Sequence, residues 1–196
     1  MTQPTQHLRP ALFLDRDGVI NVEVNYLSRP QDCILVDGIA SLLRTAHALG
    51  YVICVVTNQA GIGRGLYTEE DFHCVMRHLS AELSKEGAAW DAIYFCPFHP
   101  VHGLGEYRRD SDCRKPAPGM LLRAAAEHKL SLDRSVLVGD HCSDLEAGHA
   151  AGVKRLFLFG ATEGGDCPVA FPHRREDRLS SIEQELTATS HSAMGL

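Results

Sequence analysis

Five short apolar runs alternate along the chain with stretches of helical spacing. None of the runs contains a charged residue, and all are rich in Val, Ile, Leu or aromatic residues, which is typical of parallel strands covered on both faces. The runs are Ala11–Leu14, Tyr51–Val56, Ala92–Phe95, Val136–Val138 and Leu156–Phe159. Strands that alternate with helices predict an α/β fold, a doubly wound, mainly parallel sheet with helices on both faces.

Helix start signals support this alternation. Apolar residues recur at helical spacing over 39–46 and 72–83. Thr68 is followed by three acids, which suit the first turn of a helix, and Pro118 suits the start of a helix over Gly119–His128. After Gly160 the pattern fades, and only a last short helix over Leu179–Leu186 is expected.

The length of 196 residues and the hydrophobic content of 44% predict a single domain with one sizeable core. We expect this domain over residues 10–190, a flexible N-terminal arm over 1–9 and a loose C-terminal tail over 191–196. The roughly twenty residues from Gly18 to Gly38 suffice for a flap but not for a lid with its own core. No separate cap domain is therefore expected.

Charge and cysteine content limit the partners and the cellular compartment to be expected for this protein. The net charge of −6 argues against nucleic acid or an anionic membrane as a partner. No apolar run is long enough to span a bilayer, and no signal peptide is recognisable. Seven scattered cysteines then indicate reduced thiols in a cytoplasmic protein rather than a disulfide framework. No pattern favours an oligomer, so a monomer is the default expectation.

Polar side chains follow three of the predicted strands. Because the carboxyl ends of parallel strands lie at one edge of a sheet, these side chains should converge there. They are Asp15 and Asp17 after the first strand, Thr57, Asn58 and Gln59 after the second, and Asp140 and Asp144 after the fourth, with Lys115 in the segment before the helix that leads to that strand. Three acids can bind a divalent cation, while a hydroxyl, an amide and a lysine can hold phosphoryl oxygens. Such a set suits phosphoryl transfer, in which positioning and charge neutralisation do most of the catalysis.

On its own, Asp15-Arg16-Asp17-Gly18 is equally compatible with a solvated turn after a strand. The ordered set as a whole resembles the haloacid dehalogenase superfamily of phosphohydrolases. Within it, three segments resemble the branch that contains heptose 1,7-bisphosphate phosphatases and histidinol-phosphate phosphatases. These segments are Asp15–Asn21, Thr57–Gly65 and Cys113–Met120, and the similarity runs from about Ala11 to Phe159.

The resemblance implies catalytic roles for four residues. Asp15 would be the nucleophile that forms an aspartyl phosphate, and Asp17 the general acid and then the base for water. Thr57 and Lys115 would hold the transferring phosphoryl group. Mg²⁺ would rest on Asp15, the Asp17 carbonyl and Asp140.

The same resemblance implies a set of substrate-binding positions. They are Glu23, Val24, Asn25, Tyr26, Asn58, Gln59, Ala60, Arg114 and His141. His141 stands where heptose enzymes of this branch often carry lysine. A histidine is shorter and only partly charged near neutral pH.

The segment before Arg114 departs from the branch, whose members hold a structural zinc with Cys-x-His and Cys-x-Cys pairs. Here Phe98 replaces the histidine and Ser111 replaces one cysteine. Phenylalanine cannot bind zinc, and a serine hydroxyl is a poor substitute for a thiolate. A shifted set remains conceivable, made of Cys96, His99, His102 and Cys113. We expect a zinc-free loop in which Phe98 packs inward.

The resemblance therefore predicts a magnesium-dependent phosphomonoesterase that acts on a small phosphorylated sugar. Removal of the C7 phosphate of D-glycero-D-manno-heptose 1,7-bisphosphate is the leading assignment. Histidinol phosphate or another small phosphate ester is the alternative substrate, which the altered zinc segment and His141 keep open. A non-catalytic phosphate-binding protein is a third possibility, disfavoured because both Asp15 and Asp17 are present.

Overall fold

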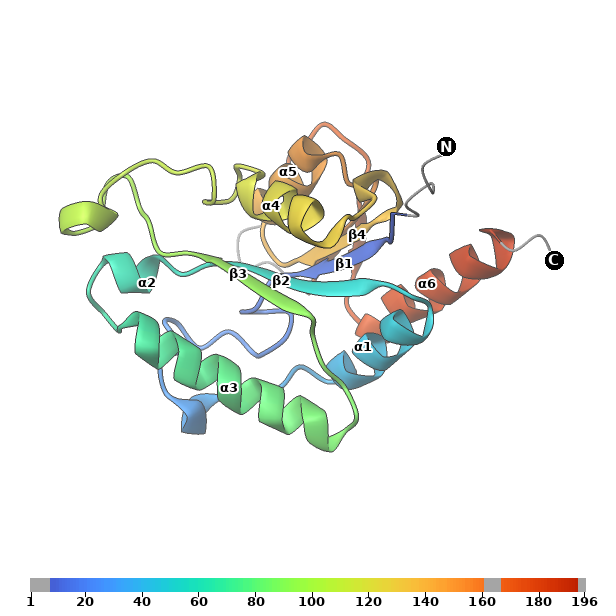
Figure 1. Ribbon diagram of the computed structural model, residues 1–196, viewed down its shortest axis with the longest axis horizontal. Helices are drawn as coiled ribbons and strands as arrows, with labels where there is room; N and C mark the ends of the chain where they lie inside the picture. Colours follow the sequence, from blue (N-terminus) through green and yellow to red (C-terminus); the bar gives the residue numbers. More distant parts are fainter. Residues whose placement is uncertain (1–7, 161–166, 194–196) are drawn as a thin grey trace, which may run out of the picture.

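The computed structural model describes residues 8–160 and 167–193. Its centre is a six-stranded, wholly parallel sheet with the strand order β3-β2-β1-β4-β5-β6 (Figure 1). The strands are β1 (Ala11–Leu14), β2 (Val52–Asn58), β3 (Ala92–Cys96), β4 (Val136–Gly139), β5 (Arg155–Phe159) and β6 (Arg174–Glu176). The predicted parallel α/β sheet is confirmed, with β1 between β2 and β4.

Helices cover both faces of the sheet (Figure 1). On one face lie α1 (Ile39–Ala48), α3 (Glu69–Lys85) and α6 (Leu179–Ala193), and on the other lie α4 (Gly119–His128) and α5 (Cys142–Ala151). The single-turn α2 (Ala60–Gly63) follows β2 directly. Three short 3-10 helices, η1 (Pro30–Asp32), η2 (Gly105–Tyr107) and η3 (Leu132–Arg134), lie in the connections.

The core consists of two hydrophobic layers, one on each side of the sheet. Because successive residues of a strand face opposite sides, Leu12 and Leu14 pack under α1, α3 and α6, whereas Ala11 and Phe13 pack under α4 and α5. All four side chains are fully buried. This burial on both faces explains why the strands are continuously apolar in sequence.

Two helices begin where the sequence predicts. The side chain of Thr68 accepts a hydrogen bond from the Asp71 backbone N–H, and Asp71 accepts one from the Thr68 backbone N–H, so the two form a capping box at the start of α3. Helix α4 begins directly after Pro118. Both starts confirm the expectation from the sequence.

The end of the chain differs from the expectation. Helix α6 continues past Leu186 to Ala193, so residues 191–193 of the expected tail are helical. Its Glu183 carboxylate accepts hydrogen bonds from Ser41 and Thr45, which ties it to α1. Strand β6 was missed because it is a polar, three-residue edge strand. Arg9 of the expected arm is bridged to Leu130, and residues 1–7 and 194–196 lie outside the described residues.

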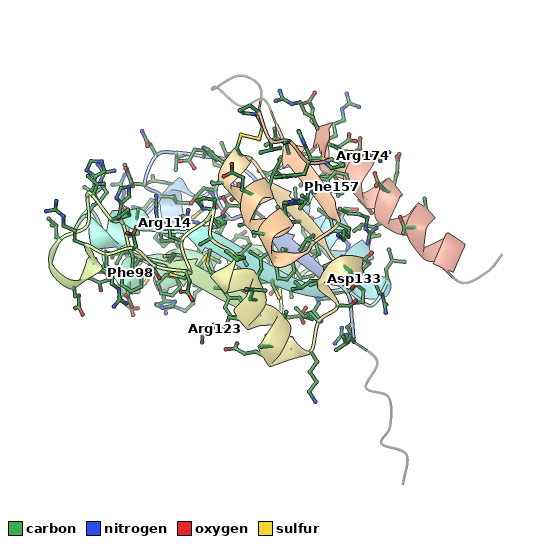
Figure 2. The ribbon with its side chains drawn as sticks, turned by 90° about the horizontal axis from the view of Figure 1, so that it is seen from above. Phe98, Arg114, Arg123, Asp133, Phe157 and Arg174 are labelled. Atoms are coloured by element: carbon green, nitrogen blue, oxygen red, sulfur yellow. A yellow bond between two sulfur atoms is a disulfide. The ribbon has the colours of Figure 1, made fainter. Side chains whose placement is uncertain are left out.

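The expectation that all cysteines are reduced is wrong for one pair. Cys142 and Cys167 form a disulfide, visible as a yellow bond in Figure 2, between the first residue of α5 and the segment that leads to β6. Two cysteines far apart in sequence meet here because α5 packs on β4 and β5, a proximity that spacing alone does not reveal. Cys33, Cys54, Cys74, Cys96 and Cys113 are free. Among the described residues, no helix is long and apolar enough to cross a membrane.

Candidate active site

The polar groups expected at the strand ends do converge. Strands β2, β1 and β4 are neighbours in register, with Leu14 beside Val55 and Val138, so their carboxyl ends form one edge. Asp15 follows β1, Thr57 ends the buried part of β2, and Asp140 follows β4. This edge is the place where parallel α/β sheets bind ligands.

Lys115 links these ends through its side chain, of which only 1% is exposed. Its Nζ lies 3.0 Å from Asp15 Oδ1 and 2.6 Å from Asp144 Oδ1, and it donates to the Val56 carbonyl at 2.8 Å. Burial disfavours the charged ammonium, but the two carboxylates outweigh this effect and raise the pKa of Lys115. The lysine is therefore a fixed positive charge beside the candidate nucleophile.

The Asn58 side chain makes its hydrogen bonds to the backbone of Lys115. The Asn58 side chain accepts from the Lys115 backbone N–H and donates to the Lys115 carbonyl, both at 3.0 Å. Asn58 is one of the expected substrate-binding residues. Its contacts show a further role, that of fixing the backbone that carries the lysine.

The Asp17 carboxyl is largely shielded from water and lies close to Asp15, the candidate nucleophile. Burial raises the pKa of Asp17, the Arg16 guanidinium 2.6 Å away opposes the rise, and the charge of Asp15 adds to it. Asn21 donates to Asp17 Oδ1 at 3.1 Å. A carboxyl group with a raised pKa can hold a proton at higher pH than usual, which suits a general acid.

The residues proposed to hold Mg²⁺ fit a hard divalent cation. A Cβ on Gly18 would lie 2.1 Å from Asp140 Oδ2, so the Asp140 carboxylate packs directly against the loop that follows Asp17. Glycine is also required there by its positive φ of +77°. Asp15, the Asp17 carbonyl and Asp140 could each offer an oxygen, and oxygen is the ligand atom that Mg²⁺ prefers.

His141 and Asp144 form the entry to α5. The Asp144 carboxylate accepts from the His141 backbone N–H at 3.0 Å, and Asp140, His141 and Asp144 bring their ligand atoms within 4.8 Å of one another. Burial raises the pKa of Asp144 to about 6, against the opposing charge of Lys115. The hydrogen bond to Asp140 raises the pKa of His141 to about 9, which favours the protonated imidazole in this arrangement.

The expected flap residues lie in the long connection between β1 and α1. Burial raises the pKa of Glu23, and the charges of Asp17 and Asp140 add to the rise, which places this carboxylate near the site. Val24 is exposed, and Asn25 and Tyr26 have left-handed backbones with φ of 54° and 61°.

Arg64, which follows α2, reaches the flap. It stacks over the Tyr26 ring at 5.2 Å and hydrogen-bonds the Tyr26 hydroxyl. Ala60 begins α2 at the rim of the same edge.

The loop after β3 projects beyond the strand ends (Figure 1) and carries Arg114. Arg114 donates to the Phe98 carbonyl at 3.3 Å, and both residues lie at the same end of the molecule in Figure 2. Phe98 is partly buried against the core layer under α4 and α5, and the Arg109 guanidinium covers its ring at 3.9 Å. This packing agrees with the expected inward position of Phe98.

The candidate zinc ligands are not gathered into one site. His99 Nδ1 accepts hydrogen bonds from the Val101 and His102 backbone N–H groups, which keeps it in the loop. Cys113 instead pairs with Ser111 Oγ at 3.0 Å and with the Cys96 thiol. Over residues 8–160 and 167–193, the one group of three or more possible metal ligands is that of Asp140, His141 and Asp144. The zinc-free loop stays a prediction.

Two buried residues near the site were not identified from the sequence. Arg16 is 1% exposed and contacts Asp17 and Gln59. Tyr67 is buried, and its hydroxyl donates to Gln59 Oε1 at 2.6 Å. The position of Arg16 between two candidate catalytic acids was a visible signal in the sequence. For Tyr67 the sequence offers none, because it lies in a turn outside any motif.

Comparison with known proteins agrees with this geometry. The profile of the HAD-hydrolase-like family matches residues 112–172. The chain is 51% identical over 148 residues to the D-glycero-alpha-D-manno-heptose-1,7-bisphosphate 7-phosphatase of Burkholderia mallei, covering 76% of this chain and 78% of that protein. It is 41% identical over 150 residues to the corresponding beta-heptose phosphatase of Vibrio cholerae, covering 76% and 81%.

A solved structure is similar over nearly the whole chain. The D,D-heptose 1,7-bisphosphate phosphatase of B. bronchiseptica, complexed with magnesium and phosphate, superposes with a TM-score of 0.79 at 26% identity. The match covers 92% of this chain and 99% of that one.

Proposed function

Because this chain belongs to the HAD-like family of heptose-1,7-bisphosphate phosphatases and is a phosphoric monoester hydrolase, we propose that it removes the C7 phosphate of D-glycero-D-manno-heptose 1,7-bisphosphate. The single observation that carries the chemistry is the buried Lys115 ammonium 3.0 Å from Asp15. A fixed positive charge beside a carboxylate is the arrangement that a phosphoryl transfer onto that carboxylate needs.

The proposed reaction has two steps at Asp15. Its carboxylate attacks phosphorus to form an aspartyl phosphate, and Asp17 gives its proton to the departing sugar oxygen. Asp17, now ionised, then takes a proton from the water that hydrolyses the aspartyl phosphate. The raised pKa of Asp17 supports the first of these proton transfers.

Lys115 and Thr57 would hold the phosphoryl oxygens during both steps. Asp15, the Asp17 carbonyl and Asp140 would hold Mg²⁺, which when bound would neutralise charge on the phosphoryl oxygens. Lys115 is shared between Asp15 and Asp144, and Arg16 lies against Asp17, so a cation held by Asp15 and Asp140 would add positive charge beside the transferring phosphoryl group.

The substrate assignment rests on the relatives and on the residues around the site. We assign contacts with the sugar and its second phosphate to four residues: Glu23 and Tyr26 of the flap, Arg114 of the projecting loop and His141 before α5. The relative at 51% identity is named for the alpha anomer and that at 41% for the beta anomer. We therefore propose the alpha anomer.

The test is magnesium-dependent phosphate release from a panel of substrates. It comprises both anomers of heptose 1,7-bisphosphate, fructose 1,6-bisphosphate, histidinol phosphate and an aryl phosphate. A kcat/KM that is highest for the alpha heptose anomer is expected. Higher activity on histidinol phosphate would overturn the substrate assignment while leaving the phosphatase chemistry in place.

A further inference from the structure

Gln59 sits at the centre of a buried hydrogen-bond network beside the site, with only 1% of its surface exposed. Its Oε1 accepts from the Tyr67 hydroxyl at 2.6 Å and from Arg16 Nη2 at 2.8 Å. Its Nε2 donates to Thr57 Oγ1 at 2.8 Å and to Asp17 Oδ2 at 3.2 Å. One amide therefore joins two catalytic side chains to two residues that the proposed reaction does not use.

The orientation of this amide follows from the chemistry of its partners. A guanidinium can only donate, and the Asp17 oxygen that faces Gln59 already accepts from Arg16 Nη2 at 2.6 Å. Turning the Gln59 amide over would place its NH2 group against Arg16 and its oxygen against Asp17. The observed orientation alone satisfies both, and the Tyr67 hydroxyl occupies the remaining lone pair of the oxygen.

Tyr67 is itself held in one place. It is 8% exposed and packs in the layer under α1, α3 and α6. A Cβ on Gly61 would lie 2.2 Å from Tyr67 Cε1, so the absence of a side chain at Gly61 is what admits the ring. The ring therefore aims its hydroxyl at Gln59 through rigid packing.

We propose that Tyr67 is a positioning residue for the phosphatase reaction, which acts through Gln59 to orient the Asp17 carboxyl and the Thr57 hydroxyl. Gln59 donates to Thr57 Oγ1, which leaves the hydroxyl proton of Thr57 to donate to a phosphoryl oxygen. Asn21 holds Asp17 Oδ1, and Gln59 together with Arg16 Nη2, 2.6 Å away, holds Oδ2, which stops the carboxyl from rotating away from the leaving group. This inference rests on the roles of Asp17 and Thr57 in the proposed function.

The test compares Tyr67→Phe with Tyr94→Phe. Tyr94 is a matched control because it is 7% exposed and its hydroxyl also makes a 2.6 Å hydrogen bond, to Glu127, in the layer under α4 and α5. In Tyr67→Phe we expect kcat on the heptose bisphosphate to fall about tenfold, with KM unchanged, as expected for loss of one orienting hydrogen bond. For the same variant, kcat on an aryl phosphate should fall less, since an aryl oxide leaves more readily without a proton. A Tyr67→Phe enzyme with the kinetics of Tyr94→Phe would overturn the proposal.

A double-mutant cycle shows whether Tyr67 acts through Gln59. In a Gln59→Leu background, Tyr67→Phe should cause no further loss of kcat, because the group that it positions is gone. Additive losses would contradict the proposed route.

Asp17→Asn separates failure of this inference from failure of the proposed function. Equal losses on alkyl and aryl phosphates would remove Asp17 from the acid role and overturn both. A loss confined to the alkyl phosphate, with Tyr67→Phe and Tyr94→Phe alike, would overturn only the role of Tyr67.

Discussion

The side chain of Asn58 makes two hydrogen bonds of 3.0 Å with the backbone of Lys115: it donates to the carbonyl and accepts from the N–H. These two residues are far apart in sequence, yet they join the carboxyl end of β2 to the segment before α4. The lysine that neutralises Asp15 therefore depends on a neighbouring strand for its position.

Removing these two hydrogen bonds should lower both the catalytic efficiency and the stability of the protein. Asn58→Ala is expected to lower kcat/KM about ten- to a hundredfold through misplacement of Lys115, and to cost about 1–3 kcal/mol of unfolding free energy for the unpaired backbone groups. Steady-state kinetics and urea unfolding measure the two effects. Asn58→Asp keeps the oxygen that accepts from the Lys115 N–H but loses the donor. Its kcat/KM should therefore lie between those of the wild type and Asn58→Ala. Wild-type kcat/KM in Asn58→Ala would show that Lys115 is held without it.

Asp15→Asn should abolish turnover and leave the protein folded. An amide of the same shape cannot attack phosphorus, while the apolar layers that stabilise the sheet are untouched. Phosphate release and a thermal melt followed by circular dichroism provide the measurement. Asp133→Asn, at an exposed carboxylate of η3 labelled in Figure 2, is the control and should keep full activity. Substantial phosphate release by Asp15→Asn would rule out the covalent mechanism.

Asp17→Asn should discriminate between leaving groups. An alkoxide is a poor leaving group and needs a proton, whereas an activated aryl oxide does not. We expect kcat to fall about a hundredfold or more on the sugar phosphate and far less on 4-nitrophenyl phosphate. Equal losses on the two substrates would be inconsistent with an acid role.

Lys115 and Asp144 are expected to be coupled in stability. Lys115→Met leaves the fully buried Asp144 carboxylate without its partner, and breaking such a buried pair costs about 3–5 kcal/mol. The double variant Lys115→Met/Asp144→Asn removes the uncompensated charge and should recover most of that loss, but no activity. Urea unfolding of the two single variants and the double variant tests this. Purely additive losses would show that the two side chains do not stabilise each other.

Cys113 should react as a thiolate at unusually low pH. The hydrogen bond from the Cys96 thiol, with a further one to Ser111, lowers the pKa of Cys113 to about 6. Because this pKa lies below the ordinary 9, the thiolate contributes stability that is complete above pH 9 and is lost as pH falls through 6. Alkylation by iodoacetamide, followed by mass spectrometry, should be half-maximal well below pH 9. Ser111→Ala should move that midpoint upward, and an unshifted midpoint in the native protein would refute the assignment.

The architecture followed from the sequence because its causes are local. Runs such as Ala11–Leu14 are apolar throughout, and that pattern is typical of a strand buried on both faces. Thr68 and Asp71 cap α3 within a single turn, so the signal lies within four residues. The convergence of Asp15, Thr57 and Asp140 also followed, since parallel strands share the edge at which they end.

The partners of those residues were decided by tertiary structure alone. Nothing in sequence spacing shows that Asn58 holds Lys115, that Cys142 meets Cys167, or that Tyr67 reaches Gln59. Each contact joins elements whose distance depends on how helices pack on the sheet and on room left by a residue such as Gly61. The sequence thus determined which chemical groups stand at the strand ends, because chain periodicity places them there. Their orientation depends on packing between segments distant in the chain, which only the folded structure specifies.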